Sequence, residues 1–192
     1  MKSGDDLIYI EGGRYMRIGL VRHFKVDIKK NKFMTSNQFN EYMKKYDVSD
    51  VIPNELVIDA EWDTCYCSSM SRAITTAKTI YHGETIITDK LVEVPSVAFV
   101  NMNIPMPYNV WALLGRFAWI RNHTSQPEGR KVTLKRINEI IDIILKKENK
   151  NILIVSHAGT LYEIKKILKK RGFEGEKFLK ARNGKLYTFQ KK

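Results

Sequence analysis

Two short apolar segments of this chain end in histidine. Ile-Gly-Leu-Val leads into Arg22 and His23, and Asn-Ile-Leu-Ile-Val-Ser leads into His157. A third segment, Thr-Cys-Tyr-Cys, runs into a serine-rich turn and Arg72, and a fourth, Thr-Ile-Ile-Thr, precedes Glu93 by a few residues. If each segment is a strand of one parallel sheet, the carboxyl ends deliver these side chains to a common edge, where such sheets bind their ligands.

These residue types suit phosphoryl transfer. Planar guanidinium groups bind phosphoryl oxygens bidentately, and the amides at a helix N-terminus bind the same anion. A neutral imidazole is a nucleophile near pH 7 and can form a covalent intermediate. A carboxylic acid that burial keeps protonated can supply the proton that a departing alkoxide needs. Positioning and cationic donors supply most of the acceleration in this reaction, so the set needs no metal.

Each signal is weak by itself. About 0.2 Arg-His dipeptides are expected by chance in a chain with this number of arginines and histidines. Arg22-His23 alone is more often a surface pair, and Glu93 alone is more often a solvated loop residue. All the segments occur together, however, and each follows a predicted strand. This combination favours one shared site.

Alternating strand and helix patterns predict the scaffold that positions these residues. Apolar or β-branched runs predict strands at 17–21, 64–67, 84–88, 151–155 and 186–189. Helical periodicity and capping residues predict helices over 38–46, 72–81, 109–120, 133–147 and 160–171. The expected fold is an α/β three-layer sandwich, with a mostly parallel central sheet and helices on both faces.

The chain of 192 residues fits one domain, residues 1–192, without an evident linker or repeat. Its 43% apolar and 28% charged residues exclude a disordered or low-complexity protein. Residues 1–15 are expected to form an edge hairpin or to be frayed, and residues 95–129, rich in Met, Trp and Phe, to form an insert that caps the site. Most of the aromatic residues in this insert are expected simply to pack its helix onto the core.

The apolar runs are too short to cross a bilayer, and the N-terminus lacks a signal-peptide core. The chain has two cysteines, Cys65 and Cys67, which share one face of a predicted strand and are interpreted as small core residues. Too few cysteines for a disulfide framework favour a reduced, cytoplasmic location. His82 and His123 stand alone, so no metal site is predicted.

The net charge of +12 is concentrated at the end of the sequence. Residues 145–192 carry fourteen Lys and Arg against four Glu. A nucleic-acid partner is one interpretation of this excess. The helical pattern at 160–171 favours another, because its lysines fall opposite its apolar residues and would face solvent. Nucleic-acid binding is therefore the less favoured interpretation.

The four segments resemble, in order, the motifs of the histidine phosphatase (phosphoglycerate mutase-like) superfamily. They are Ile18-Gly-Leu-Val-Arg-His23, Ser68-Ser-Met-Ser-Arg-Ala-Ile-Thr-Thr-Ala77, Leu91-Val-Glu93 and Ile154-Val-Ser-His-Ala-Gly159. The stretch 133–145, which contains Arg136, also looks like the family's helix before its second histidine. The resemblance extends from about residue 16 to residue 168.

The resemblance implies that His23 is the nucleophile, that Arg22 and Arg72 hold the phosphoryl oxygens, and that His157 also contacts them. It implies that Glu93 donates the proton to the leaving group and later acts as the base for water. The family needs no metal or other cofactor.

The sequence departs from the family pattern directly after the first histidine, where Phe24 replaces the usual glycine. A bulky ring there is expected to narrow the substrate pocket or to alter the local backbone. Arg116 and Arg121, in the predicted insert, are candidates for further anion contacts.

The expected function is a metal-independent phosphatase that hydrolyses a small-molecule phosphomonoester through a phosphohistidine on His23. Two alternatives remain open at this point. One is a phosphoglycerate mutase-type phosphoryl transferase, which uses the same residues when water is excluded. The other is a catalytically weak protein that binds a phospho-ligand or nucleic acid. No membrane partner is expected, and a homodimer is possible.

Overall fold

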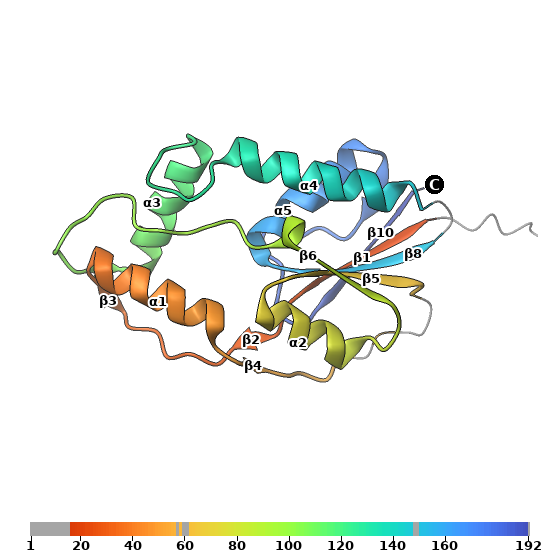
Figure 1. Ribbon diagram of the computed structural model, residues 1–192, viewed down its shortest axis with the longest axis horizontal. Coiled ribbons are helices and arrows are strands. Elements are labelled where there is room, and N and C mark those ends of the chain that lie inside the picture. Colours follow the sequence, from red (N-terminus) through yellow and green to blue (C-terminus); the bar gives the residue numbers. More distant parts are fainter. Residues whose placement is uncertain (1–15, 57, 59–61, 148–149, 192) are drawn as a thin grey trace, which may run out of the picture.

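A six-stranded sheet forms the centre of the protein (Figure 1). The computed structural model describes residues 16–56, 58, 62–147 and 150–191. Within these residues the strand order is β6-β5-β8-β1-β10-β9. The strands are β1 (Arg17–Arg22), β5 (Thr64–Ser68), β6 (Thr85–Thr88), β8 (Asn151–Ser156), β9 (Phe173–Gly175) and β10 (Leu186–Lys191). The first four in the order, β6 to β1, are parallel, whereas β10 and β9 are antiparallel to their neighbours.

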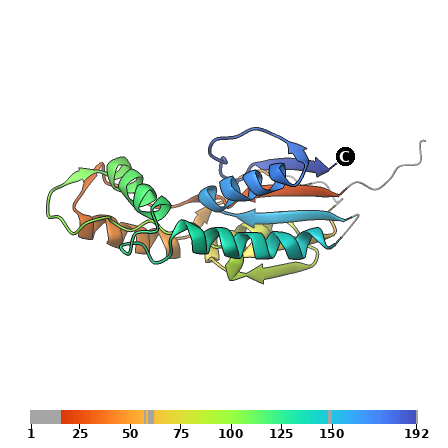
Figure 2. The ribbon, with the colours of Figure 1, turned by 90° about the horizontal axis from the view of Figure 1, so that it is seen from above.

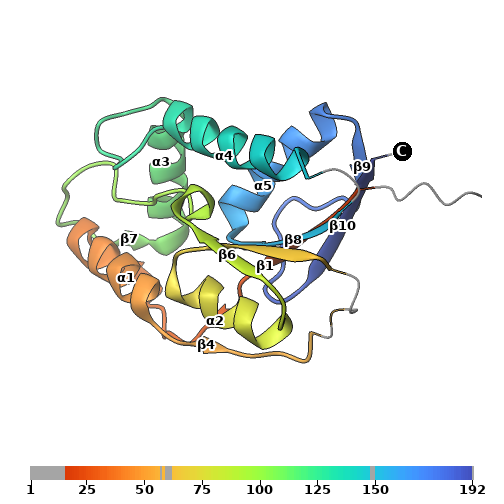
Figure 3. The same ribbon diagram turned by 45° about the vertical axis from the view of Figure 1, so that its right-hand side comes forward.

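Helices cover both faces of this sheet. Figure 3 shows α2 (Ser71–Ile80) on one side of the sheet and α4 (Arg130–Leu145) and α5 (Ala158–Lys170) on the other. The predicted α/β three-layer sandwich with a mostly parallel sheet is therefore confirmed. The helix predicted over 160–171 begins two residues earlier, directly after His157, which is its N-cap residue.

Successive side chains of the central strands point to opposite faces of the sheet and so form the two halves of the core. In β8, Ile152 and Ile154 pack with α4 and α5, whereas Leu153 and Val155 pack with α2. A strand buried on both faces reads as one apolar run, and for this reason the sequence reveals these strands clearly. The two cysteines of β5 are free and lie in the α2 half of the core, as predicted.

Two further helices pack together beside the sheet. Helix α1 (Ser36–Val48) and α3 (Tyr108–Ile120) lie side by side at one end of the molecule (Figure 2). They enclose a third apolar cluster that contains Phe39 and Trp111, and the indole Nε1 of Trp111 donates to the carbonyl of Met34 at 2.7 Å. Helix α3 belongs to the segment 95–129 that was predicted as an insert over the site.

Four very short strands flank α1 and α3 in the sequence. They form the ribbons β2 (Lys25–Val26) with β4 (Val51–Ile52), and β3 (Phe33–Met34) with β7 (Met106–Pro107). Two-residue strands are too short to show a periodicity in the sequence, and none of these four strands was predicted. The 3-10 turn η1 (Asp89–Leu91) follows β6.

The prediction for residues 1–15 lies outside the described residues. No helix among the described residues combines the length and the apolar character that crossing a membrane requires.

Replacing Thr76 of α2 by valine is expected to destabilise the fold. The buried Thr76 hydroxyl accepts the N–H of Phe24 at 2.9 Å and donates to the carbonyl of Arg72 at 2.7 Å. Valine has a similar shape but leaves the buried Phe24 N–H without an acceptor, which costs about 1–3 kcal/mol. Urea denaturation measures the loss. Thr76→Ser keeps the hydroxyl and serves as the control; equal losses in both variants would contradict this account.

Candidate active site

The ends of β1 and β8 place two histidines side by side. These strands pair in parallel register with Arg22 opposite Ser156, and the N–H of His23 donates to the carbonyl of Ser156 at 2.9 Å. Each strand then continues into a histidine, and the ring centroids of His23 and His157 are 5.1 Å apart. The predicted convergence of these two segments therefore follows directly from the sheet register.

The ring of His23 is held in one orientation. Its Nδ1–H donates to the carbonyl of Phe24 at 2.6 Å, so in the neutral ring the lone pair is on Nε2. Burial, followed by repulsion from Arg72 and Arg22, lowers the pKa of His23 to about 3, and the hydrogen bond to Phe24 opposes this shift. The imidazole is therefore neutral near pH 7, with a fixed tautomer, and its Nε2 has no hydrogen-bond partner among the described residues.

The second histidine lies in an equally buried position. His157 Nε2 forms a 2.8 Å hydrogen bond with the hydroxyl of Ser68, the last residue of β5. Burial, and then the nearby charges led by Arg72, hold the pKa of His157 well below its usual value. Its Nδ1 atom is buried and has no partner within the described residues.

Two arginines reach the same point from different strand ends. Arg22 ends β1, and its Nη1 donates to the carbonyl of Ala181 at 3.1 Å. Arg72 lies in the first turn of α2 with a side chain that is only 1% exposed, and its Nη1 donates to Asp47 Oδ1 at 3.0 Å. The Nε atoms of both arginines are buried without a partner in the described part of the chain. Guanidinium donors that are buried without acceptors favour an anion as their ligand.

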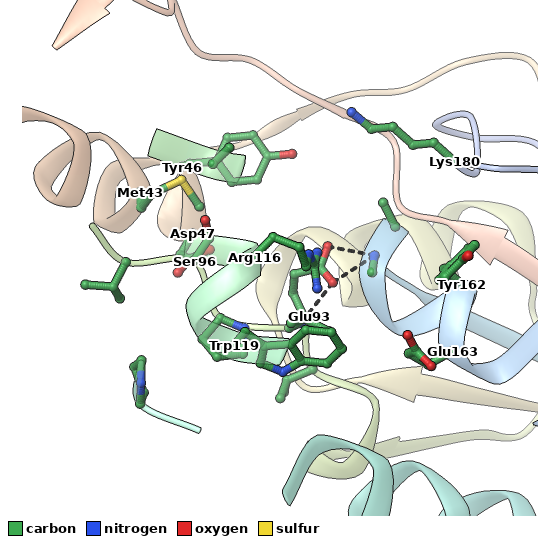
Figure 4. A pocket seen from close by; sticks show the side chains of 18 of the residues that line it. Met43, Tyr46, Asp47, Glu93, Ser96, Arg116, Trp119, Tyr162, Glu163 and Lys180 are labelled. Carbon is green, nitrogen blue, oxygen red and sulfur yellow. Dashed lines mark hydrogen bonds between the residues drawn. The ribbon is translucent and has the colours of Figure 1, made fainter. Parts of the chain in front are cut away.

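Glu93 is positioned by the N-terminus of α5. Its Oε1 accepts the N–H groups of Gly159 at 3.0 Å, Thr160 at 3.2 Å and Val94 at 2.9 Å, and Figure 4 shows the carboxyl beside this helix end. Amides at a helix N-terminus are well suited to hold a carboxylate.

Arg136 of α4 fixes the backbone that carries Glu93. Its guanidinium donates to the carbonyls of Lys90 at 2.9 Å, Val92 at 3.0 Å and Glu93 at 3.4 Å, and it forms an ion pair with Glu128 at 2.6 Å. The fork of one arginine therefore organises the whole turn between β6 and Glu93. From the sequence, Arg136 was recognised only as part of the helix that includes 133–145.

A cavity of about 1230 Å³ opens above these residues. Arg22, Arg72 and Glu93 line it, whereas His23 and His157 do not. Its wall combines aromatic and apolar side chains with several cations, and in Figure 4 Arg116 lies beside Glu93. Further lining residues include Lys44, Tyr46, Asp47, Tyr108, Leu113, Trp119, Arg130, Tyr162, Lys166 and Lys180.

Two of the predicted pocket residues lie elsewhere. Phe24 is fully buried in the core half that contacts α2, because a large apolar ring gains more from burial there than from exposure in a polar site. Arg121 lies outside the cavity lining, and its guanidinium covers the exposed ring of Phe117. Five residues along a helix correspond to about 140° of rotation, so Arg121 cannot share the direction of Arg116, which does line the cavity.

Several site residues were not found from the sequence. Asn183, in the loop before β10, donates its amide to the carbonyl of His23 at 2.7 Å and to that of Phe24 at 3.2 Å. Tyr46 and Asp47 come from α1 and contact Arg72. None of these three residues lies in a local pattern that indicates a site. Only the assembled fold brings them to it.

The described residues contain no group of three His, Cys, Asp or Glu side chains arranged to hold a metal ion.

Replacing His23 by glutamine is expected to make stability less sensitive to acid. Between the ordinary pKa of 6.5 and the folded value of about 3, the unfolded chain binds a proton that the folded chain excludes. The free energy of unfolding is therefore unaffected by the titration of His23 above pH 6.5, and it falls as the pH is lowered from 6.5 toward 3.

At pH 5 this loss amounts to about 2 kcal/mol for His23 alone. Urea denaturation at pH 7.5 and pH 5 in phosphate-free buffer compares the wild type with His23→Gln. His82→Gln, at an exposed histidine, is the matched control. If the free energy of unfolding fell by the same amount between pH 7.5 and pH 5 in the wild type and in His23→Gln, the lowered pKa of His23 would be disproved.

Comparisons with known proteins agree with this geometry. The alpha-ribazole phosphatase from Shigella flexneri shares the fold with a TM-score of 0.55 and 19% identity, covering 90% of this chain and 89% of its own. A phosphoserine phosphatase from Entamoeba histolytica, solved with 3-phosphoglyceric acid, gives a TM-score of 0.51 and 16% identity, with 90% and 89% coverage. No curated protein sequence matches the chain. The profile of the histidine phosphatase superfamily (branch 1) matches residues 54–190, which is more than half of the chain, and the protein therefore belongs to this superfamily.

Proposed function

We propose that the protein is a metal-independent phosphatase that hydrolyses a phosphomonoester through a phosphohistidine on His23. One observation carries this proposal: Arg22, His23, Arg72 and His157 converge from separate segments of the chain. Three of these side chains, the two arginines and His157, keep buried polar atoms without partners among the described residues. A tetrahedral dianion would supply acceptors for them and would balance the buried positive charge.

The assignment of His23 depends on geometry more than on the family match. The matched range begins at residue 54 and so includes Arg72, Glu93 and His157 but not Arg22 or His23. The register of β1 against β8 supplies the link, because it places His23 next to the matched His157.

In the proposed first half-reaction, Nε2 of His23 attacks phosphorus while the bond from phosphorus to the ester oxygen breaks. The guanidinium groups of Arg22 and Arg72 hold the equatorial oxygens, over which the transition-state charge is spread. Glu93, in its protonated form, passes its proton to the departing oxygen. The products are a neutral alcohol, a phosphohistidine and an ionised Glu93.

In the second half-reaction water attacks the phosphohistidine. The carboxylate of Glu93 accepts a proton from this water, the bond from phosphorus to Nε2 breaks, and inorganic phosphate leaves. The helix amides that donate to Glu93 suit the carboxylate form that this step requires. At the end the carboxyl group is protonated again and the imidazole is neutral.

The cavity supports a large leaving group. Its volume of about 1230 Å³ exceeds the roughly 300–1,000 Å³ that small-molecule sites usually provide. Tyr108, Leu113 and Trp119 offer apolar surface, and Arg116 and Lys180 add positive charge. The proposed substrates are therefore bulky phosphomonoesters. The two similar structures named above are called alpha-ribazole phosphatase and phosphoserine phosphatase, which agrees with phosphatase chemistry without identifying this substrate.

Full activity toward an aryl phosphate is expected in excess EDTA, and His23→Ala is expected to lose it. A phosphoenzyme trapped by rapid quenching should be labile in acid and stable in base, as a phosphorus–nitrogen bond requires. His82→Ala, which removes an exposed histidine, is the matched control and should retain activity.

Three outcomes would count against the proposal. Loss of activity in EDTA contradicts the metal-independent scheme, and an active His23→Ala excludes His23 as the nucleophile. A phosphoenzyme that is stable in acid and labile in base reassigns the nucleophile to a hydroxyl group. Formation of an isomeric phosphate ester in place of inorganic phosphate would favour a mutase.

Arg136→Lys is expected to lower kcat by about tenfold or more, because a lysine cannot hold three carbonyls and a carboxylate at once. The loss should depend on the leaving group. The hydrolysis of an alkyl phosphate, whose alkoxide needs a proton from Glu93, should slow far more than the hydrolysis of a nitrophenyl phosphate. A purely structural role for Arg136 would slow both substrates equally.

Arg171→Lys provides the matched control for this experiment. Arg171 pairs with Asp142 and does not line the cavity. Its replacement should leave kcat for both substrates unchanged.

A further inference from the structure

The last turn of α1 covers the groups that would hold a phosphoryl group. Asp47 accepts hydrogen bonds from Arg72 Nη1 through both Oδ1, at 3.0 Å, and its backbone carbonyl, at 3.4 Å. The ring of Tyr46 lies over the same guanidinium, with the Arg72 Cζ 5.1 Å from the ring centroid. Tyr46 also makes a T-shaped contact with His23 at 6.5 Å between centroids.

This turn separates His23 from the cavity. Tyr46 and Asp47 line the cavity, whereas His23 does not and is only 1% exposed. Tyr46 contacts both the cavity and the imidazole, and it is therefore positioned between them. A substrate phosphorus must approach the free Nε2 of His23, so these contacts have to change when a phosphoryl group enters.

The contact between Asp47 and Arg72 is of a kind that can be displaced. Burial raises the pKa of Asp47, and the attraction of Arg72 does not compensate for it fully, while the Glu93 carboxylate adds repulsion. The Asp47 side chain is 44% exposed and has a path to solvent, whereas that of Arg72 is 1% exposed and is fixed. Asp47 also leaves the Nε of Arg72 without a partner among the described residues.

A phosphoryl dianion satisfies the guanidinium better than this carboxylate does. It carries up to two negative charges and presents three oxygens, so two of them can engage Nη1 and Nη2 together, whereas Asp47 places one carboxylate oxygen on Nη1. The second guanidinium, of Arg22, lines the same cavity and attracts the same anion. Competition for Arg72 therefore favours a phosphoryl group over Asp47.

We propose that Asp47 is a gating residue: its carboxylate occupies Arg72 until a phosphoryl group displaces it, and this displacement exposes His23. The proposal depends on the proposed function only in taking Arg72 as a phosphate ligand. Through this competition Asp47 weakens the binding of every phosphate ester. It also keeps the nucleophile covered until an anion of sufficient charge arrives.

The rate at which diethyl pyrocarbonate modifies His23 tests the gate without measuring turnover. This reagent acylates neutral imidazole nitrogens, and peptide mass analysis resolves the four histidines of the chain. His23 should react slowly in the wild type and about threefold to tenfold faster in Asp47→Asn and Asp47→Ala. The exposed His82 and His123 serve as internal references and should react at unchanged rates.

The affinity for inorganic phosphate provides the second measurement. Titration calorimetry should show binding about threefold to tenfold tighter in Asp47→Asn, because the anion no longer competes with a carboxylate. With an aryl phosphate the same variant should show a lower KM and a nearly unchanged kcat, as expected when substrate and transition state gain equally.

Two variants separate displacement from general effects of charge. Asp47→Glu keeps the carboxylate and should behave nearly as the wild type. Asp50→Asn removes the same charge three residues away, at an exposed position outside the cavity lining, and should change neither measurement. If Asp50→Asn and Asp47→Asn increased the affinity for inorganic phosphate equally, the proposal would be overturned, because the effect would then come only from a long-range change in charge.

The outcomes also distinguish this proposal from the proposed function. Unchanged His23 reactivity and phosphate affinity in an active Asp47→Asn would remove the gate and leave the phosphatase assignment intact. Tighter phosphate binding and faster His23 modification, in a protein that forms no phosphoenzyme, would support the gate and remove the assignment of the reaction.

Discussion

Positive charge buried without sufficient counter-charge is the constraint on which the site depends. Arg22 and Arg72 reach one point from two strand ends, and together with burial they keep both nearby imidazoles neutral by lowering the pKa of His23 and of His157. The same field attracts a phosphoryl dianion. In the proposed reaction, the neutral state of His23 and the attraction of phosphate therefore have a common origin, and Asp47 is the nearby carboxylate that partly relieves this charge.

One helix end connects the two halves of the proposed chemistry. His157 is the N-cap residue of α5, and the amides of the next residues, Gly159 and Thr160, hold the carboxyl group of Glu93. The second histidine and the proton donor are therefore fixed to the same rigid element. Arg136 secures the other side of Glu93 by binding the backbone of the preceding turn.

The sequence was informative where a local pattern repeats and uninformative where only tertiary contacts decide. Strands β1, β5 and β8 are buried on both faces and were predicted from their short runs, and Arg22, His23 and His157 lie at the ends of β1 and β8, where the sequence predicted them. Phe24 could not be placed, because a ring beside the nucleophile points into the core or the cavity according to the backbone turn that follows β1. A helix was predicted over 38–46, one residue short of Asp47, and the position of Asp47 over Arg72 depends on the packing of α1 against α2 and α3, which no spacing reveals.

The loop before β10 has a consequence for the order in which the protein can become functional. Asn183 donates to the carbonyls of His23 and Phe24, Gly184 donates to the carbonyl of Arg22, and β10 pairs with residues 17–21 of β1. The turn that carries His23 is among the first parts of the described chain to leave a ribosome, whereas the residues that hold it in place leave more than 150 residues later. A nascent chain therefore cannot assemble this turn until Asn183, Gly184 and β10 have been synthesised.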